Sequence, residues 1–260
     1  MTSSWQFSEA EFYVLWMDQL GEDPPDPFMF TSATRTAEEF DAELRAARES
    51  LSRQFDRDFR SAFDTISDPD LYLTVYGWDE RARWSVGPMI RIRALRKGRK
   101  GYVIRQLPGP THWRRGGYTV DECDPYELAS VVVASLPPVD RGNRGDIELV
   151  TDDQELDHDF RHSPIAAGVE TEESRTKEFL TAPAATAGEI HIVQGKSAYG
   201  PRGITHHRVR YRDLEDDGRY AITDNPARAL AVDSSRLTSI LDDRVAKVLQ
   251  AMAEEGMDPW

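Results

Sequence analysis

The chain has 260 residues, and its 46 acidic against 32 basic residues give a formal net charge of −14. Nucleic acid and anionic membranes both repel a protein with this charge, so we expect neither as a partner. No apolar run approaches the roughly 20 residues that cross a bilayer. The first 34 residues contain no Lys or Arg, which is unlike a signal peptide. The sequence therefore predicts a cytoplasmic, globular protein without membrane insertion.

The N-terminal part of the chain predicts three amphipathic helices. Ser8 forms a capping box with Glu11, and apolar residues at helical spacing follow as far as Gly21. Thr36, which also has a Glu three residues later, opens a longer helix, and a short third helix ends before Pro69. The apolar stripes of these helices need a sheet to cover.

From residue 71 onward the apolar residues alternate with a period of two, which predicts strands joined as an antiparallel meander. These strands are predicted at 71–76, 88–96, 101–107 and 116–120, and a helix follows from Asp124. The same order returns near the C-terminus, with strands at 189–193, 203–214, 218–223 and 229–232 before a helix from Asp233.

We therefore predict an α+β fold with a central antiparallel β-sheet, helical bundles, and a quasi-twofold internal repeat of β-meander plus helix. The chain is expected to form a single domain over residues 1–260. Its pseudo-repeat halves are about 1–139 and 188–256, and an acidic connector at 140–187 joins them. The repeat rests on element order, because direct identity between the halves is low.

The acidic turn from Asp213 to Asp224 nearly reproduces a calcium-binding loop. Asp213, Glu215 and Asp217 stand at the ligand positions, Gly218 follows at the turn position, and Asp224 is the twelfth residue. The flanks, however, are predicted strands, and Asp-Gly is a strong hairpin signal, so we favour a hairpin. A calcium-binding protein, or a small-molecule enzyme of unknown reaction, remains an alternative.

Nothing else in the sequence indicates catalysis, a metal centre or a cofactor. No phosphate-binding or dinucleotide-binding glycine motif and no hydrolase nucleophile motif occurs. Cys123 is the only cysteine, so an internal disulfide is excluded and a packing role is expected. We predict a protein that is not an enzyme and uses no cofactor.

Positive charge is concentrated in residues 77–115, where eleven Arg and Lys stand against two acidic residues. This local charge of +9 allows two interpretations. It attracts an acidic partner, or the acidic remainder of the protein neutralises it. A nucleic-acid-binding module that uses this segment is a further alternative.

Within the basic segment, the predicted loop 77–87 carries the strongest signal for a binding surface. It holds Trp78 and Trp84 beside Arg81 and Arg83. Trp and Arg dominate the energetics of protein interfaces, so these four are candidate partner-binding residues. The alternative is that both indoles fold back onto the edge of the sheet.

The order of these features resembles the EspG family of actinobacterial type VII (ESX) secretion. The resemblance runs from about residue 5 to residue 252, and no single motif in it is diagnostic. Its most similar stretches are EAEFYVLWMDQLG, RTAEEFDAEL, SDPDLYLTVYG, IRIRALRKGRKGYVIRQL and DDGRYAITDNPARALAVDSSRLTSILDDRV. The turn Gly218-Arg219-Tyr220 is similar to one that opens a C-terminal strand in the family, and it adds Arg219 and Tyr220 to the candidate partner-binding residues.

This resemblance implies a cytosolic chaperone that holds a helical secretion substrate of the PE/PPE type, one copy of each, soluble for export. In the family, the cargo surface lies on the sheet and the C-terminal helical region, together with the loop between the second and third strands. If a short first strand near Trp5-Gln6-Phe7 is counted, that loop is 77–87 here. A rigid sheet with aromatic and basic side chains could then cover the apolar tip of the cargo.

Overall fold

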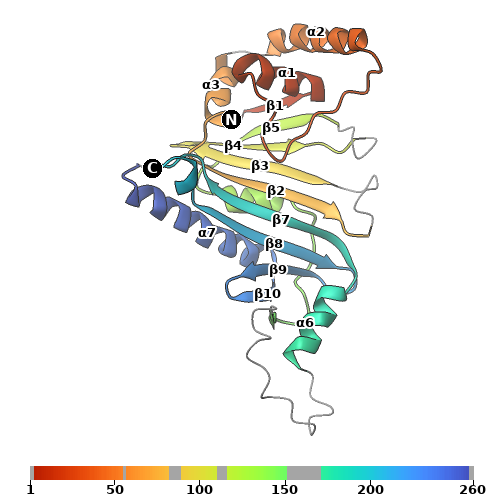
Figure 1. Ribbon diagram of the computed structural model, residues 1–260, viewed down its shortest axis with the longest axis vertical. Coiled ribbons are helices and arrows are strands. Elements are labelled where there is room, and N and C mark those ends of the chain that lie inside the picture. Colours follow the sequence, from red (N-terminus) through yellow and green to blue (C-terminus); the bar gives the residue numbers. More distant parts are fainter. Residues whose placement is uncertain (1–2, 55–56, 82–88, 110–115, 151–170, 258–260) are drawn as a thin grey trace.

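The computed structural model describes residues 3–54, 57–81, 89–109, 116–150 and 171–257, and it is built around one large antiparallel sheet (Figure 1). The strands follow one another across the sheet in the order β1-β5-β4-β3-β2-β7-β8-β9-β10-β6. The strands of the first half are β1 (Ser4–Phe7), β2 (Leu71–Asp79), β3 (Ile90–Lys97), β4 (Lys100–Gln106) and β5 (Tyr118–Cys123). Those of the second half are β6 (Ile147–Glu148), β7 (Ala184–Gln194), β8 (His206–Leu214), β9 (Arg219–Asp224) and β10 (Ala227–Ala231).

Helices cover the sheet unequally on its two faces. The helices are α1 (Glu9–Leu20), α2 (Ala37–Gln54), α3 (Arg57–Ile66), α4 (Leu128–Ala134), α6 (Glu172–Thr181) and α7 (Ser234–Glu254). One face packs against α4 and α7 through an apolar core that includes Leu73, Val75 and Ile190. On the opposite face, α1 to α3 cover one end of the sheet and α6 covers the other (Figure 1). Among the described helices, none covers the middle strands on that second face.

The N-terminal helices begin where the sequence predicts. The Ser8 hydroxyl accepts a hydrogen bond from the Glu11 backbone N–H at 3.2 Å, and the Glu11 carboxylate accepts one from the Ser8 N–H at 2.7 Å. Gly21 ends α1 in the left-handed region at φ 72°, which a residue without a Cβ adopts at no steric cost. An aromatic core joins this unit to the sheet, with the Phe12 and Tyr118 rings stacked at 4.0 Å.

The C-terminal helix α7 provides most of the cover on the other face. Asp233 caps its first turn by accepting from the Arg236 N–H at 2.8 Å. The helix buries Leu237, Leu241 and Val248 against the sheet. Apolar residues at helical spacing explain this placement, because they form one stripe that must leave water.

Two segments differ from the sequence-based expectation. The proposed connector 140–187 contains the expected short helix, α6, but also β6 and the beginning of β7, which starts at Ala184 rather than at residue 189. The small residues there show no period of two, and a β-bulge interrupts the pairing between Ala184 and Thr186. The helix expected from Asp124 begins at Leu128 after one turn.

The expectation of an α+β protein with a large antiparallel sheet is confirmed. The order of four strands and a helix occurs twice, as β2 to β5 with α4 and as β7 to β10 with α7. The two central strands of the sheet, β2 and β7, are antiparallel neighbours. None of the helices in the described ranges combines the length and the apolar character that a bilayer crossing requires.

Candidate functional site

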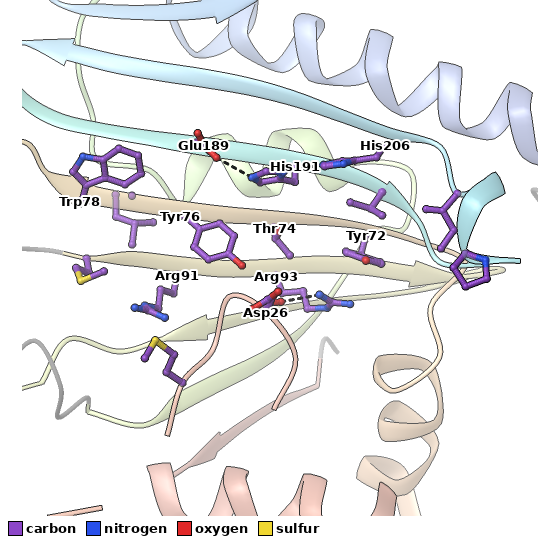
Figure 2. Close-up of a pocket in the computed structure, with 17 residues that line it drawn as sticks. Asp26, Tyr72, Thr74, Tyr76, Trp78, Arg91, Arg93, Glu189, His191 and His206 are labelled. Carbon is purple, nitrogen blue, oxygen red and sulfur yellow. Dashed lines mark hydrogen bonds and ion pairs between the residues drawn. The ribbon is translucent and has the colours of Figure 1, made fainter. Parts of the chain in front are cut away.

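The uncovered middle of the sheet forms a groove of about 860 Å³ (Figure 2). Its floor is made by alternate residues of the central strands, and the chain segment that follows α1 forms one wall through Asp26 and Met29. The residues labelled in Figure 2 are Asp26, Tyr72, Thr74, Tyr76, Trp78, Arg91, Arg93, Glu189, His191 and His206. The groove is thus lined by aromatic, basic and acidic groups from β2, β3, β7 and β8.

The strand pattern explains why these side chains face the groove. Successive side chains of a strand point to opposite faces of its sheet. In β2, Leu73 and Val75 are fully buried against the α4–α7 side, so Tyr72, Thr74 and Tyr76 face the groove. A central strand that is covered on both faces would be apolar throughout, and this strand is not.

Arg91 and Arg93 of β3 lie on the groove wall and are only 8% and 7% exposed. Arg91 Nη1 donates to the Pro27 carbonyl at 2.5 Å, and Arg93 Nη1 donates to the Asp26 carbonyl at 2.7 Å. The Arg93 guanidinium also lies over the Tyr72 ring, 3.8 Å from its centroid. Burial lowers the pKa of both guanidinium groups, because it disfavours the charged form.

Tyr76 lies between the two arginines and the histidines of the neighbouring strand. Burial, together with the nearby Asp26 carboxylate, raises the pKa of Tyr76 to about 12. The hydroxyl is therefore neutral at physiological pH and can act as a hydrogen-bond donor in the groove.

Two histidines and a glutamate form a hydrogen-bonded row across β7 and β8. His191 Nδ1 lies 2.8 Å from His206 Nε2, and His191 Nε2 lies 3.2 Å from a Glu189 carboxylate oxygen. Burial and the neighbouring His191 lower the pKa of His206. Within the described ranges, no cluster of three or more His, Cys, Asp or Glu side chains is arranged to hold a metal ion.

The residues predicted in the 77–87 loop divide into two groups. Trp78 belongs to the end of β2, is half-buried and lines the groove. Arg81 follows it at the surface and forms ion pairs with Asp79 at 3.3 Å and Glu215 at 3.2 Å. Arg83 and Trp84 lie outside the described residues. Trp78 is thus the candidate from this loop that reaches the groove among the residues described.

Arg219 and Tyr220 lie in the interior rather than on the surface. The Arg219 guanidinium donates to both Asp213 carboxylate oxygens, at 2.7 and 2.8 Å, and both side chains are at most 3% exposed. Tyr220 is fully buried against Phe179 of α6, with ring centroids 5.2 Å apart. Arg219 thus anchors the β8–β9 hairpin through Asp213, and Tyr220 packs it against α6. Neither side chain is exposed at the surface.

The acids of the calcium-like turn point to separate arginines instead of a common centre. Leu214 N–H donates to the Gly218 carbonyl at 3.0 Å, so the turn closes the β8–β9 hairpin as expected. Each of the four acids has its own basic partner, and these pairs are Asp213–Arg219, Glu215–Arg81, Asp217–Arg144 and Asp224 with Arg208 and Arg210. This distribution favours a structural role for the turn.

Acidic residues from elsewhere in the protein neutralise part of the basic segment 77–115. Lys97 pairs with Asp68 at 2.7 Å, and Arg105 pairs with Asp121 at 2.7 Å. Arg91, Arg93 and Arg96 are buried, so they add little to the charge at the surface. The parts of the segment that the structure describes are thus not a continuous basic surface of the kind that binds a nucleic-acid backbone.

The candidate residues from the sequence miss most of the groove, because polar residues that alternate with apolar ones in a strand are also typical of an ordinary solvent-exposed face. Tyr72, Tyr76, Arg91, Arg93 and His191 were not among the candidate residues. The available signal was the alternation of aromatic and basic residues within LYLTVY and RIR in strands that lie mid-sheet. Which strands lie mid-sheet, however, depends on long-range pairing that the local pattern does not contain.

We compared this chain with known protein families, curated proteins and solved structures. No curated protein is similar enough to this sequence to count as a relative. Among solved structures, the Mycobacterium tuberculosis type VII secretion system chaperone EspG5, determined in complex with a PE25-PPE41 dimer, shares the fold with a TM-score of 0.60. The identity is 10%, and the match covers 95% of this chain and 96% of that chain. The model of the EspG family matches residues 8–250. This match spans nearly the whole sequence, and the chain therefore belongs to the EspG family.

Proposed function

We propose that this protein is a cytoplasmic, non-enzymatic chaperone of type VII secretion that binds a PE/PPE-like helical substrate. One copy of the chaperone holds one copy of the substrate and keeps it soluble for export. The groove on the open face of the sheet carries this proposal, since it is a large concave surface on a rigid part of the fold. Support also comes from the solved complex of EspG5 with a PE25-PPE41 dimer.

The chemistry of the groove suits the tip of a helical bundle. Such a tip presents apolar side chains together with the polar groups that end its helices. Tyr72, Tyr76 and Trp78 offer aromatic contact area, and Arg91 and Arg93 offer hydrogen-bond donors. Aromatic and arginine side chains in a recess are typical of the residues that dominate binding energy.

We extend the binding surface to the end of β2 and the segment after it. Trp78 lines the groove, and Arg81 follows at its margin. Arg83 and Trp84 come next in the sequence, and we keep them as candidate partner-binding residues. Arg219 and Tyr220 support the hairpin from below, so their contribution to binding is indirect in this proposal.

We also propose that the single domain is a quasi-twofold repeat. In the described residues each half has a strand, then one or more helices, then four strands, then a helix, and the halves meet at the antiparallel pair β2–β7. The helices that precede each central strand lie on the groove face. Their separation leaves the groove between the halves.

Co-expression with a PE/PPE-like protein tests the function directly. We expect a stable complex of one chaperone with one substrate, or with one PE/PPE pair, when the mass is measured by size-exclusion chromatography with light scattering. A substrate that aggregates while this chain elutes alone would contradict the proposal for that substrate class.

Trp78→Ala tests the assignment of the groove. Loss of a half-buried aromatic side chain at an interface is expected to weaken substrate binding by about 1–3 kcal/mol, with little change in the melting temperature. Tyr126→Ala is the matched control, because Tyr126 is an exposed aromatic residue outside the groove. Equal affinities of both variants and the wild type would remove Trp78 from the site.

A further inference from the structure

The arginines on the groove face fall into two groups that differ in their partners. In β8, Arg210 pairs with Asp224 at 2.7 Å, and Arg212 pairs with Glu80 at 2.8 Å. In β3, Arg91 and Arg93 form no ion pair with any carboxylate of the described residues, and their hydrogen-bond acceptors there are main-chain carbonyls. The two β3 arginines are therefore the less neutralised group.

The hydrogen-bonding capacity of these two side chains is largely unused. A guanidinium carries five N–H donors. Arg91 and Arg93 each make one hydrogen bond to a main-chain carbonyl among the described residues, and their Nε atoms are buried without an acceptor, as is the Nε of Arg210. What distinguishes the two β3 arginines from Arg210 is therefore the missing ion pair and not the unpartnered Nε.

Burial of the Arg91 and Arg93 charges is not expected to stabilise the fold. A buried charge without a counter-charge costs free energy, and burial accordingly lowers the pKa of both guanidinium groups. Asp26 offers Arg93 its main-chain carbonyl, and its carboxylate attracts both guanidinium groups without forming an ion pair with either. The two guanidinium groups are thus available to bind an acidic group from another molecule.

We propose that Arg91 and Arg93 bind a carboxylate that the substrate protein presents, an Asp or Glu side chain at the tip of its helical bundle. Arginine recognises carboxylates through paired N–H···O bonds, which give both affinity and orientation. The identity of the partner rests on the function proposed above, whereas the carboxylate site itself rests on the groove geometry (Figure 2).

Neighbouring aromatic residues prepare the site. The Tyr72 ring lies under the Arg93 guanidinium at 3.8 Å and fixes its plane. The Tyr76 hydroxyl, which lines the same groove, stays protonated at neutral pH and can donate to the incoming carboxylate. A single carboxylate needs only the two neighbouring guanidinium groups of Arg91 and Arg93, whereas a nucleic-acid backbone needs an extended basic surface.

A titration with sodium acetate tests the carboxylate site without any substrate protein. The protein is labelled with ¹⁵N at arginine Nε, and its signals are assigned through Arg91→Met and Arg93→Met. We expect the Arg91 and Arg93 signals to shift and saturate with acetate but not with sodium chloride at equal ionic strength. The Arg208 signal, from an arginine already paired with Asp224, is the internal control. Unmoved Arg91 and Arg93 signals would overturn the site.

Substrate affinity provides the second test. The double variant Arg91→Met/Arg93→Met should bind a PE/PPE-like protein at least tenfold more weakly, and the dependence of its affinity on salt should be smaller. The melting temperature of the free double variant should stay equal or rise, because an uncompensated buried charge is gone. Arg208→Met should change affinity less than twofold.

The two tests separate this site from the proposed function. If the wild type binds acetate at Arg91 and Arg93 but no PE/PPE-like protein, the function fails and the site stands. If the double variant keeps full affinity for the substrate, the site fails and the function stands. If the double variant does not fold, the acetate titration of the wild type decides.

Discussion

The arginines of β3 and those of β8 and β9 belong to one sheet but lie in opposite electrostatic situations. In register, Arg91 and Arg93 stand opposite Tyr76 and Thr74 of β2, neither of which can neutralise them at physiological pH. Arg210 has Glu189 opposite it on β7 and Asp224 within bonding distance on β9. The number of arginines in a strand therefore predicts its charge, while the neighbouring strands decide whether that charge is compensated.

The largest change in stability is expected at the buried ion pair of Arg219 with Asp213. Arg219→Ala leaves Asp213 as an uncompensated charge that is 2% exposed, so stability should fall by about 3–5 kcal/mol, measured by urea denaturation. Replacement of both partners, as Arg219→Met with Asp213→Leu, should recover most of this loss. A loss below about 1 kcal/mol for the single variant would show that the pair does not behave as a buried one.

A smaller loss is expected at Arg212, which joins β8 to the end of α6. Its guanidinium donates to Glu80 at 2.8 Å and to the Phe179 and Ala182 carbonyls at 2.7 and 2.9 Å. Arg212→Ala should cost about 1–3 kcal/mol, because the carbonyls at the helix end lose their donors. Hydrogen exchange should accelerate in α6 and not in α1, and equal acceleration in both would argue against a local role.

Replacement of Arg93, unlike that of Arg219 or Arg212, is not expected to lower the free energy of unfolding. Arg93→Met removes a charge that has no carboxylate partner among the described residues, so the free energy of unfolding should change by less than about 1 kcal/mol or increase. Urea denaturation of the free protein provides the measurement. A loss above about 2 kcal/mol would mean that the hydrogen bond to the Asp26 carbonyl and the contact with Tyr72 stabilise the fold more than burial of the charge destabilises it.

The smallest effect concerns the exposed pair of Arg210 with Asp224. Burial acts to raise the pKa of Asp224, but Arg208 and Arg210 more than offset it, so the pKa lies below its usual value. The pair therefore adds stability above the unfolded-state pKa of about 3.9, and this contribution is lost as pH falls through the lower folded-state value. Arg210→Ala should cost under about 0.5 kcal/mol at pH 7, because the pair is exposed to solvent. The difference from the wild type should vanish near pH 2, and a difference that persists there would point to packing rather than charge.

Local sequence patterns predicted most of the elements of this fold. The Ser8 capping box, the Asp233 cap and the hairpin that ends at Gly218 depend on residues a few positions apart. The alternating apolar residues of β2 likewise report which face is buried. Elements without such a local pattern were missed, namely the two-residue strand β6 and the first residues of β7.

The candidate site was much less accessible from the sequence. The sequence drew attention to Trp78, which lines the groove, but also to Arg219 and Tyr220, which are buried. Polar residue types do not reveal whether their neighbours neutralise them or cover them. Arg219 is neutralised by Asp213, six residues earlier. Arg91 has no such carboxylate partner among the described residues and donates to a main-chain carbonyl.

The sequence by itself determined the helices, most of the strands and the acidic net charge, because each depends on composition or on short-range spacing. The order of these features along the chain carried the resemblance to the EspG family. Only the tertiary structure decided that β2 and β7 lie together mid-sheet, and that the helices before them cover the two ends of one face. It also decided which arginines have carboxylate partners. These features depend on contacts between residues far apart in the chain, which form only when the two halves share one sheet and leave its centre open.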